Sequence, residues 1–393
     1  MKRFLPLLPI LFAVPTAAQN NVQDDSTAII ARIESPQTPD HQGLDSFTFP
    51  DLMRRFHVPG VSIAVVRDFK IHWAKAYGVA DIESGRPVET TTTFQAASIS
   101  KPVTAMGAMH LVQEGRFKLD DDINTILKSW KVPDSEFTRG HPVTPRSLMS
   151  HTSGADDGFG FPGYDPSGPR PTLVQILNGE KPSNTGPVLF TRPPYQAYKY
   201  SGGGVTLMQL ALADLTQKPF AQMMRELVLD PLGMRDSSYE QPLPPDRAQH
   251  ASRAHSGQGK SMGAVWHIYP EQEAAGLWTT PSDLAQFIIE VQRAVRGPKG
   301  SVLSQQSASA MITPIGVGPY AIGLDIEKRG EGWYFQHSGG NWGFICDIFG
   351  HVRKGYGVAI MTNSETGGPL IREIESRIAA AYNWDSLDKP LLR

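Results

Sequence analysis

Ser98 and Lys101 are the residues of this chain whose types and spacing most directly suggest chemistry. They stand three positions apart, where a β-rich stretch gives way to an apolar segment after Pro102, and residues three apart on a helix are neighbours. The Lys101 amine could therefore take the proton that the Ser98 hydroxyl must lose before it attacks a carbonyl carbon. The free N–H groups and positive dipole end of a first helical turn would stabilise negative charge there. The pair predicts an activated serine nucleophile.

The four-residue pattern S-x-x-K is weak evidence by itself, since residues 386–389 repeat it near the C-terminus. Pro390 follows that second copy and prevents a helix. Pro102, in contrast, falls in the first turn of a helix expected over residues 102–113, where proline is tolerated. A helix-capping serine beside a solvated lysine is the alternative interpretation of the first copy.

Two further segments could complete a catalytic site. Tyr200 ends a proline-rich segment and precedes a glycine turn that lets backbone approach a ligand, and a nearby cation would stabilise its phenolate. Residues 337–340 follow an expected strand, and a backbone N–H there, with that of Ser98, would form an oxyanion hole. Tyr195 and Tyr198 compete with Tyr200 for the first role. A β-bulge with a surface histidine is the alternative for the second.

Three other patterns suggest sites that the flanking sequence does not support. Residues 259–263 fit the G-x-S-x-G pattern, but the polar stretch before them and the proline at 270 argue against the strand and helix that a nucleophile elbow needs. The acidic run at 120–122 indicates a solvated turn, and His250 and His255 indicate a solvated loop pair. Because no His-Glu-x-x-His or comparable cluster occurs, we expect neither a metal nor another cofactor.

The bulk composition is that of an ordinary globular protein with a sizeable core: 393 residues, 40% hydrophobic and 19% charged. Residues 1–18 have the charged start, apolar run and small-residue cleavage site of a secretory signal, so we expect an exported protein without a stable membrane anchor. Removing Lys2 and Arg3 leaves 35 basic residues against 39 acidic ones, a formal charge of −4. This balance favours a small-molecule or peptide partner over nucleic acid. The single cysteine, Cys346, is expected to be buried and inert.

Apolar runs and turn signals predict strands near both ends of the chain and helices between them. We expect a hairpin from strands at 61–66 and 71–77, further strands at 320–327, 333–337, 344–350 and 355–362, and helices at 102–113, 172–177, 205–215, 220–227, 281–293 and 369–382. Residues 19–43 are polar and are expected to form a flexible lead-in. The sequence therefore predicts an α+β protein, with one sheet assembled from about 44–100 and 318–385 and a mainly helical and loop region at about 101–317.

Five segments in this order resemble motifs of the serine β-lactamase-related hydrolases, a family that contains class C β-lactamases, D-alanyl-D-alanine carboxypeptidases, D-aminopeptidases and β-lactamase-like esterases. The segments are FQAASISK at 94–101, LMSHTSG at 148–154, YSG at 200–202, PLGM at 231–234 and HSGG at 337–340. The resemblance covers roughly residues 45–385, and we take 44–385 as the domain. It implies a penicillin-recognising fold, with an antiparallel sheet flanked by helices and a helical subdomain beside it.

The resemblance also implies roles for individual residues. By position, Ser98 is the acylated nucleophile, Lys101 its proton partner and Tyr200 the general base and acid that shuttles protons. His337 stands where the family carries a basic residue, and Gly340 would supply the second oxyanion donor. Further substrate contacts are expected at Ser338, Gly339, Gly202 and Trp342. Substrate choice is expected to depend on the aromatic residues of 155–198 and of the opposite wall, namely Phe159, Phe161, Tyr164 and Trp342.

Two departures from the family pattern bear on the substrate. The tyrosine motif usually ends in an asparagine that contacts a substrate amide, but this chain has Gly202. His337, whose reference pKa is about 6.5, is only partly cationic where β-lactamases carry lysine. We therefore expect an exported serine hydrolase that forms an acyl-enzyme with a small ester or a D-amino-acid peptide and turns over β-lactams slowly or not at all. The alternatives are a class C-like β-lactamase or D-alanyl-D-alanine carboxypeptidase, and a non-enzymatic sensor of penicillins or wall fragments.

Overall fold

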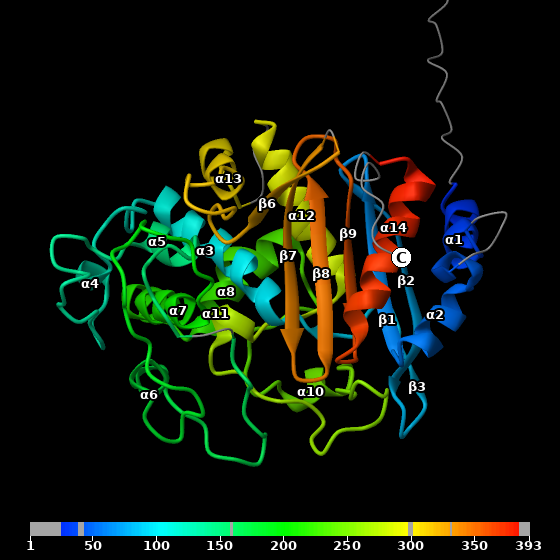
Figure 1. The fold of residues 1–393 in the computed structure, drawn as a ribbon, viewed down its shortest axis with the longest axis horizontal. Coiled ribbons are helices and arrows are strands. Elements are labelled where there is room, and N and C mark those ends of the chain that lie inside the picture. Colours follow the sequence, from blue (N-terminus) through cyan, green and yellow to red (C-terminus); the bar gives the residue numbers. More distant parts are fainter. Residues whose placement is uncertain (1–24, 38–42, 158–159, 298–301, 331, 385–393) are drawn as a thin grey trace, which may run out of the picture.

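The centre of the protein is an antiparallel sheet whose strands come from both ends of the chain (Figure 1). The computed structural model describes all residues except 1–24, 38–42, 158–159, 298–301, 331 and 385–393. The expected signal at 1–18, the second S-x-x-K copy and Phe159 lie outside the described residues. The strand order is β3-β2-β1-β9-β8-β7-β6. The bounds are β1 Gly60–Arg67, β2 Lys70–Asp81, β3 Arg86–Pro87, β6 Asp325–Arg329, β7 Gly332–Asn341, β8 Phe344–His351 and β9 Gly357–Thr362.

Helices lie around this sheet and in a region beside the end of the sheet that carries β7 and β6. A separate short sheet pairs β4 (Phe94–Gln95) with β5 (Trp278–Thr279). The helices are α1 Ser26–Glu34, α2 Phe49–Arg55, α3 Ser100–Gln113, α4 Ile123–Ile126, α5 Pro145–Met149, α6 Leu173–Asn178, α7 Gly202–Thr216, α8 Phe220–Met224, α9 Asp230–Leu232, α10 Pro245–Ala248, α11 Gln272–Ala275, α12 Pro281–Val295, α13 Gln305–Met311 and α14 Gly367–Tyr382. Single turns form at η1 Gly43–Ser46 and η2 Ala97–Ile99, and α8 continues into a π-helical turn at η3 Arg225–Leu229. No helix in the described part of the chain combines the length and apolar character needed to cross a bilayer.

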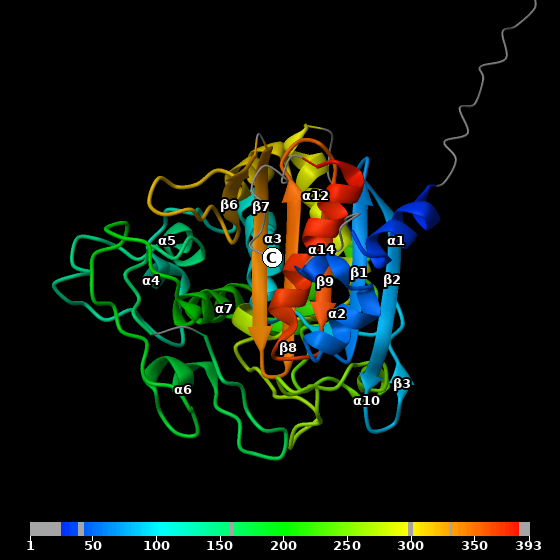
Figure 2. The ribbon, with the colours of Figure 1, turned by 45° about the vertical axis from the view of Figure 1, so that its right-hand side comes forward.

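Alternate side chains of the central strands enter two separate cores, because successive residues of a strand point to opposite faces. In β9, Ala359 and Met361 belong to the core that contains α3 and α12, whereas Val358 and Ile360 belong to the core under α14. Helices α1, α2 and α14 cover this second face (Figure 2). The sheet is therefore buried on both sides. The turn that carries Ser98 lies on the side covered by α3.

The α+β fold is confirmed, and most expected elements form within a few residues of their predicted bounds. The prediction of a flexible lead-in is wrong for the residues of α1. This helix forms because Ile29, Ile30 and Ile33 pack into the second core. The strand expected from residue 320 begins only at Asp325, since a turn closed by the Ala321 N–H to Leu324 carbonyl bond (2.8 Å) precedes it. Strand β7 is longer than expected and continues through the HSGG segment to Asn341.

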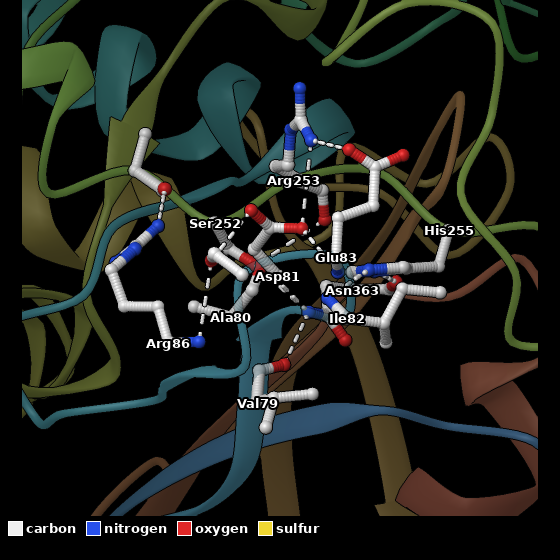
Figure 3. Close-up of polar contacts among 12 residues, drawn as sticks. Val79, Ala80, Asp81, Ile82, Glu83, Arg86, Ser252, Arg253, His255 and Asn363 are labelled. Atoms are coloured by element: carbon white, nitrogen blue, oxygen red, sulfur yellow. Dashed lines mark hydrogen bonds and ion pairs between the residues drawn. The ribbon is translucent and has the colours of Figure 1, made fainter.

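The expected solvated pair is wrong for His255, which is fully buried, whereas His250 is exposed. The Nδ1 of His255 lies 2.9 Å from the carbonyl oxygen of Asn363, just after β9. The Asn363 side chain in turn accepts from the Gly60 N–H at 2.7 Å and donates to the Val79 carbonyl at 3.0 Å. Figure 3 shows this network between the end of β2 and the 252–255 segment, with an ion pair of Arg253 and Glu83 at its exposed side. Buried polar groups need such partners, and here they fasten the segment to the sheet.

Candidate active site

Ser98 lies in η2, a 3₁₀ turn that continues directly into α3. The Ser100 hydroxyl donates to the Ala97 carbonyl at 2.6 Å and accepts from the Leu277 N–H at 2.9 Å, which ties the turn to the strand pair beside it. Ala97 has a φ of 47°, a left-handed conformation that costs free energy for a residue with a Cβ and is concentrated at functional sites. The sequence therefore places the nucleophile on a constrained turn at the start of a buried helix.

The Lys101 amine lies 2.9 Å from Ser98 Oγ and donates to the Ala274 carbonyl at 2.8 Å. The alternative of a solvated lysine is wrong, because Lys101 is only 4% exposed. Burial lowers the pKa of Lys101 to about 7, although the nearby Glu273 and Asp157 carboxyl groups act to raise it. Near neutral pH a substantial fraction of the amine is therefore uncharged and able to accept the serine proton.

Tyr200 is hydrogen-bonded to Ser98, and its ring centroid lies 5.0 Å from the Lys101 Nζ. Burial raises the pKa of Tyr200, so the side chain is a protonated phenol at neutral pH. This favours Lys101 as the first proton acceptor and Tyr200 as the donor. Of the competing tyrosines, Tyr195 bonds the Thr144 hydroxyl at 2.6 Å and Tyr198 stacks on another tyrosine ring in the cavity wall.

The residues around Tyr200 hold the phenol in place. Its ring stacks on His151 with 4.2 Å between centroids, and the His151 Nδ1 accepts the Ser201 N–H at 3.2 Å. The Ser201 hydroxyl caps α7 by accepting the Gly204 N–H at 2.8 Å and donates to Asp157. Asp157 also accepts the Gly203 N–H at 2.6 Å. The start of α7 is therefore fixed by a carboxylate that the sequence analysis missed.

His337 is a neutral group, which contradicts the expectation of a partly cationic side chain. Burial, followed by the charge of Lys101, lowers its pKa to about 3. Its Nδ1–H donates to the Ser338 carbonyl at 2.6 Å, which leaves Nε2 as an acceptor 3.4 Å from the Tyr320 hydroxyl. Lys101 is therefore the cation next to the nucleophile, and it too loses charge near pH 7.

The far half of β7 presents an open edge beside the nucleophile. Strand β6 pairs with residues 332–336, and its first residue, Asp325, lies opposite Gln336. Residues 337–341 therefore have no strand partner on that side in the described part of the chain. The η2 turn packs on Gly339, where an added Cβ would lie 2.4 Å from the Ala96 carbonyl oxygen. Glycine is therefore required for this close approach. Ser98 and Gly340, the two expected oxyanion donors, both line the cavity at this edge.

This cavity has a volume of about 970 Å³ and brings the predicted catalytic residues together. Ser98, Tyr200 and His337 line it, together with Ser338, Gly339 and Gly340. The lining also includes two other kinds of side chain: the aromatic ones of Phe161, Tyr198 and Tyr320, and the charged ones of Asp325, Arg329, Arg372 and Glu375. Among the described residues no group of three or more metal-ligating side chains is present.

Three of the residues expected to contact substrate lie elsewhere. Gly202 is not among the lining residues and is covered by Phe161. Trp342 stacks on His267 with ring centroids 4.1 Å apart, and the backbone N–H of Trp342 donates to the Tyr269 hydroxyl. Tyr164 is buried, and its hydroxyl lies 3.4 Å from Glu271. Among the described members of the expected aromatic set, Phe161 is thus the one that reaches the cavity.

Glu273 is a second buried carboxyl group that the sequence analysis missed. It lies in α11 next to the carbonyl that holds Lys101, and its Oε2 has no hydrogen-bond partner among the described residues. Burial raises the pKa of the Glu273 carboxyl group well above its usual range, and the charge of Lys101 acts in the opposite direction. A glutamate in a short helix between turns gives no sequence signal of this burial.

Comparison with known proteins identifies the chain. A model of the Beta-lactamase family matches residues 48–383. The chain belongs to this family. The resemblance seen in the five sequence motifs is therefore confirmed, and the Ser98, Lys101 and Tyr200 arrangement is that of a serine hydrolase of the Beta-lactamase family.

Proteins that are similar to this chain have different names. Protein flp of Staphylococcus aureus (strain MW2) is 26% identical over 349 residues, which cover 86% of this chain and 66% of flp, so the chain spans just under two thirds of that relative. Esterase EstB of Burkholderia gladioli is 25% identical over 385 residues, covering 84% of this chain and 93% of EstB. The crystal structure of D-alanine carboxypeptidase AmpC from Burkholderia cenocepacia has a TM-score of 0.67 at 17% identity, covering 91% and 99% of the two chains. This last similarity supports the fold.

Proposed function

We propose that this Beta-lactamase family member is an exported serine hydrolase that forms an acyl ester at Ser98 with small carboxylic esters. D-amino-acid peptides and amides are the second substrate class. The observation that carries the proposal is the meeting of the Lys101 amine and the Tyr200 phenol at the Ser98 hydroxyl. Export is proposed from the signal-like sequence of residues 1–18.

In the first step the uncharged Lys101 amine accepts the Ser98 proton, and Oγ forms a bond to the carbonyl carbon of the substrate. The backbone N–H groups of Ser98 and Gly340 stabilise the oxyanion of the tetrahedral intermediate. As the bond to the leaving alkoxide breaks, the proton that left Ser98 reaches the alkoxide through the Lys101 and Tyr200 pair. The same pair then takes a proton from water as the water oxygen bonds to the acyl carbon. The bond between that carbon and Ser98 Oγ breaks, the pair returns the proton to Oγ, and the acid is released.

Three features favour an ester over a β-lactam. A β-lactam antibiotic carries a carboxylate, and the position that is lysine in β-lactamases is here a neutral histidine, His337. An amide side chain that could contact the substrate is also missing, because the relevant position is Gly202. Burial of the Lys101 amine further limits the positive charge available to a carboxylate. The name of Esterase EstB supports the same substrate class, and that of the D-alanine carboxypeptidase supports the second.

Turnover and intact mass measured on one panel test the proposal. The purified chain is incubated with p-nitrophenyl acetate, p-nitrophenyl butyrate, a D-alanyl-D-alanine peptide and nitrocefin, beside the Ser98→Ala variant. We expect ester turnover with a transient acyl adduct on Ser98, and no adduct on the variant. Rapid nitrocefin turnover without ester hydrolysis would contradict the proposal, as would a stable adduct that is never released, which is the behaviour of a sensor.

A further inference from the structure

The position where related enzymes carry an amide side chain is filled by an aromatic ring. An ideal Cβ added at Gly202 would lie 2.8 Å from Cε2 of Phe161, and 3.4 and 3.5 Å from two other atoms of the same ring. A contact of 2.8 Å to a Cβ is shorter than proteins tolerate. A side chain at position 202 therefore requires the Phe161 ring to shift, and in this chain the phenyl ring occupies the space.

The segment that carries Phe161 is held in place by contacts of the three residues that follow it. Tyr164 exchanges two backbone hydrogen bonds of 2.8 Å with Ile268, and the Pro162 carbonyl lies 2.8 Å from the His267 Nδ1. Gly163, with a φ of 72°, packs so closely on Tyr269 that an added Cβ would lie 2.6 Å from its ring. Phe161 thus lines the cavity at the start of a segment that is bound to residues 267–269.

Phe161 contributes an apolar surface next to the catalytic tyrosine. It lines the cavity of Ser98 and Tyr200 together with Pro162, Tyr198 and Tyr320. A phenyl edge offers neither a donor nor an acceptor, so an amide group of a substrate placed against it would lose its bonds to water and gain none. An alkyl or aryl group in the same place would gain contact area without that loss.

We infer that Phe161, through its contact with Gly202, is a specificity-determining residue that favours acyl groups with an apolar chain over those with an amide beside the reacting carbonyl. This inference rests on the proposed function, because it names the acyl group of the ester. Its substrate class is esters of simple alkanoic and arylalkanoic acids. Acylated amino acids are disfavoured.

The test compares two p-nitrophenyl esters of equal chain length, the valerate and the N-acetylglycinate, which differ by an amide in place of two methylenes. The quantity measured is the ratio of their kcat/KM values after subtraction of the uncatalysed rates. We expect the wild type to prefer the valerate by roughly tenfold or more, and Phe161→Ala to lower this ratio by about tenfold. Phe137→Ala removes a half-buried phenyl ring outside the cavity and serves as the matched control with an unchanged ratio.

A double variant separates the position of the ring from a general loss of activity. Gly202→Asn alone is expected to lose acylation by both esters, because its Cβ meets the Phe161 ring. Adding Phe161→Ala should restore acylation and move the ratio further toward the N-acetylglycinate. An unchanged ratio in Phe161→Ala, or a double variant no better than Gly202→Asn, overturns the inference while leaving the proposed function intact. Absence of an acyl-Ser98 adduct with either ester in the wild type overturns the proposed function itself.

Discussion

Gly339 sets the distance between the nucleophile turn and the edge of β7, and the Gly339→Ala substitution tests this arrangement. The new Cβ would lie 2.4 Å from the Ala96 carbonyl oxygen and 2.7 Å from the Cys346 sulfur, whereas ordinary contacts begin at 3.4 Å. Relief of the clash with Ala96 requires the two backbones to separate by about 1 Å. Because η2 carries Ser98, this separation moves the nucleophile away from the oxyanion donor on β7.

A displacement of about 1 Å at a reacting group lowers rates by about 100-fold, which corresponds to about 2.7 kcal/mol of activation free energy. We expect a loss of this size in the acylation rate, measured by stopped-flow release of p-nitrophenol in the first turnover. Overpacking of this kind also costs about 1–3 kcal/mol of unfolding free energy. Urea unfolding of the same preparation therefore accompanies the rate measurement and ensures that folded protein is compared.

Two other glycines provide controls for this prediction. Gly263 has no heavy atom within 4 Å of an added Cβ, so Gly263→Ala should leave the acylation rate unchanged. Gly340→Ala keeps its backbone N–H, and its Cβ meets the flexible end of Ile345 at 3.3 Å, so its loss should be much smaller than that of Gly339→Ala. Acylation of Gly339→Ala within about threefold of the wild type, against the predicted 100-fold loss, would refute the reasoning.

Three further predictions concern charge and stability. The kcat/KM for p-nitrophenyl butyrate should rise with pH through an apparent pKa of about 7, because the Lys101 amine must lose its proton to act as a base. A pH profile that is flat between about pH 5 and 9 would contradict this prediction. Asp157→Asn removes a negative charge that raises the pKa of Lys101, so the same limb should move to lower pH, and a shift to higher pH would exclude this origin. Arg377→Met should lower the free energy of unfolding, measured in urea, by about 3–5 kcal/mol. The substitution leaves the buried Glu373 side chain and four backbone carbonyls without their donor. A loss below about 1 kcal/mol would contradict the prediction and show that the site relaxes around the change.

Much of the site follows from local sequence. The spacing of Ser98 and Lys101 predicts their contact because both lie on one continuous turn and helix, and the observed 2.9 Å bond agrees with it. The meeting of Tyr200 and His337 with this pair depends on how distant segments pack, and only the order of the five motifs indicated it. The α+β fold was predictable from local sequence as well, because strong apolar runs mark the strands at both ends of the chain.

The features that the sequence left out depend on burial and on contacts between remote segments. The neutral state of His337 arises from its enclosure beside Lys101, which its neighbours in sequence do not reveal. Helix α1 has only 9 residues and forms because Ile29, Ile30 and Ile33 pack into the second core. The contact of Phe161 with Gly202 joins two loops without periodicity, so no pattern could predict it.

The central claim is that Ser98 carries the acyl group, and intact-mass measurement with peptide mapping tests it most directly. The chain is mixed with p-nitrophenyl butyrate, quenched in acid within the first turnovers and compared with the Ser98→Ala variant. The account predicts a mass increase of one butyryl group on the peptide that contains Ser98, and no increase in the variant. A butyryl group on another residue, or an equal increase in Ser98→Ala, would contradict the account.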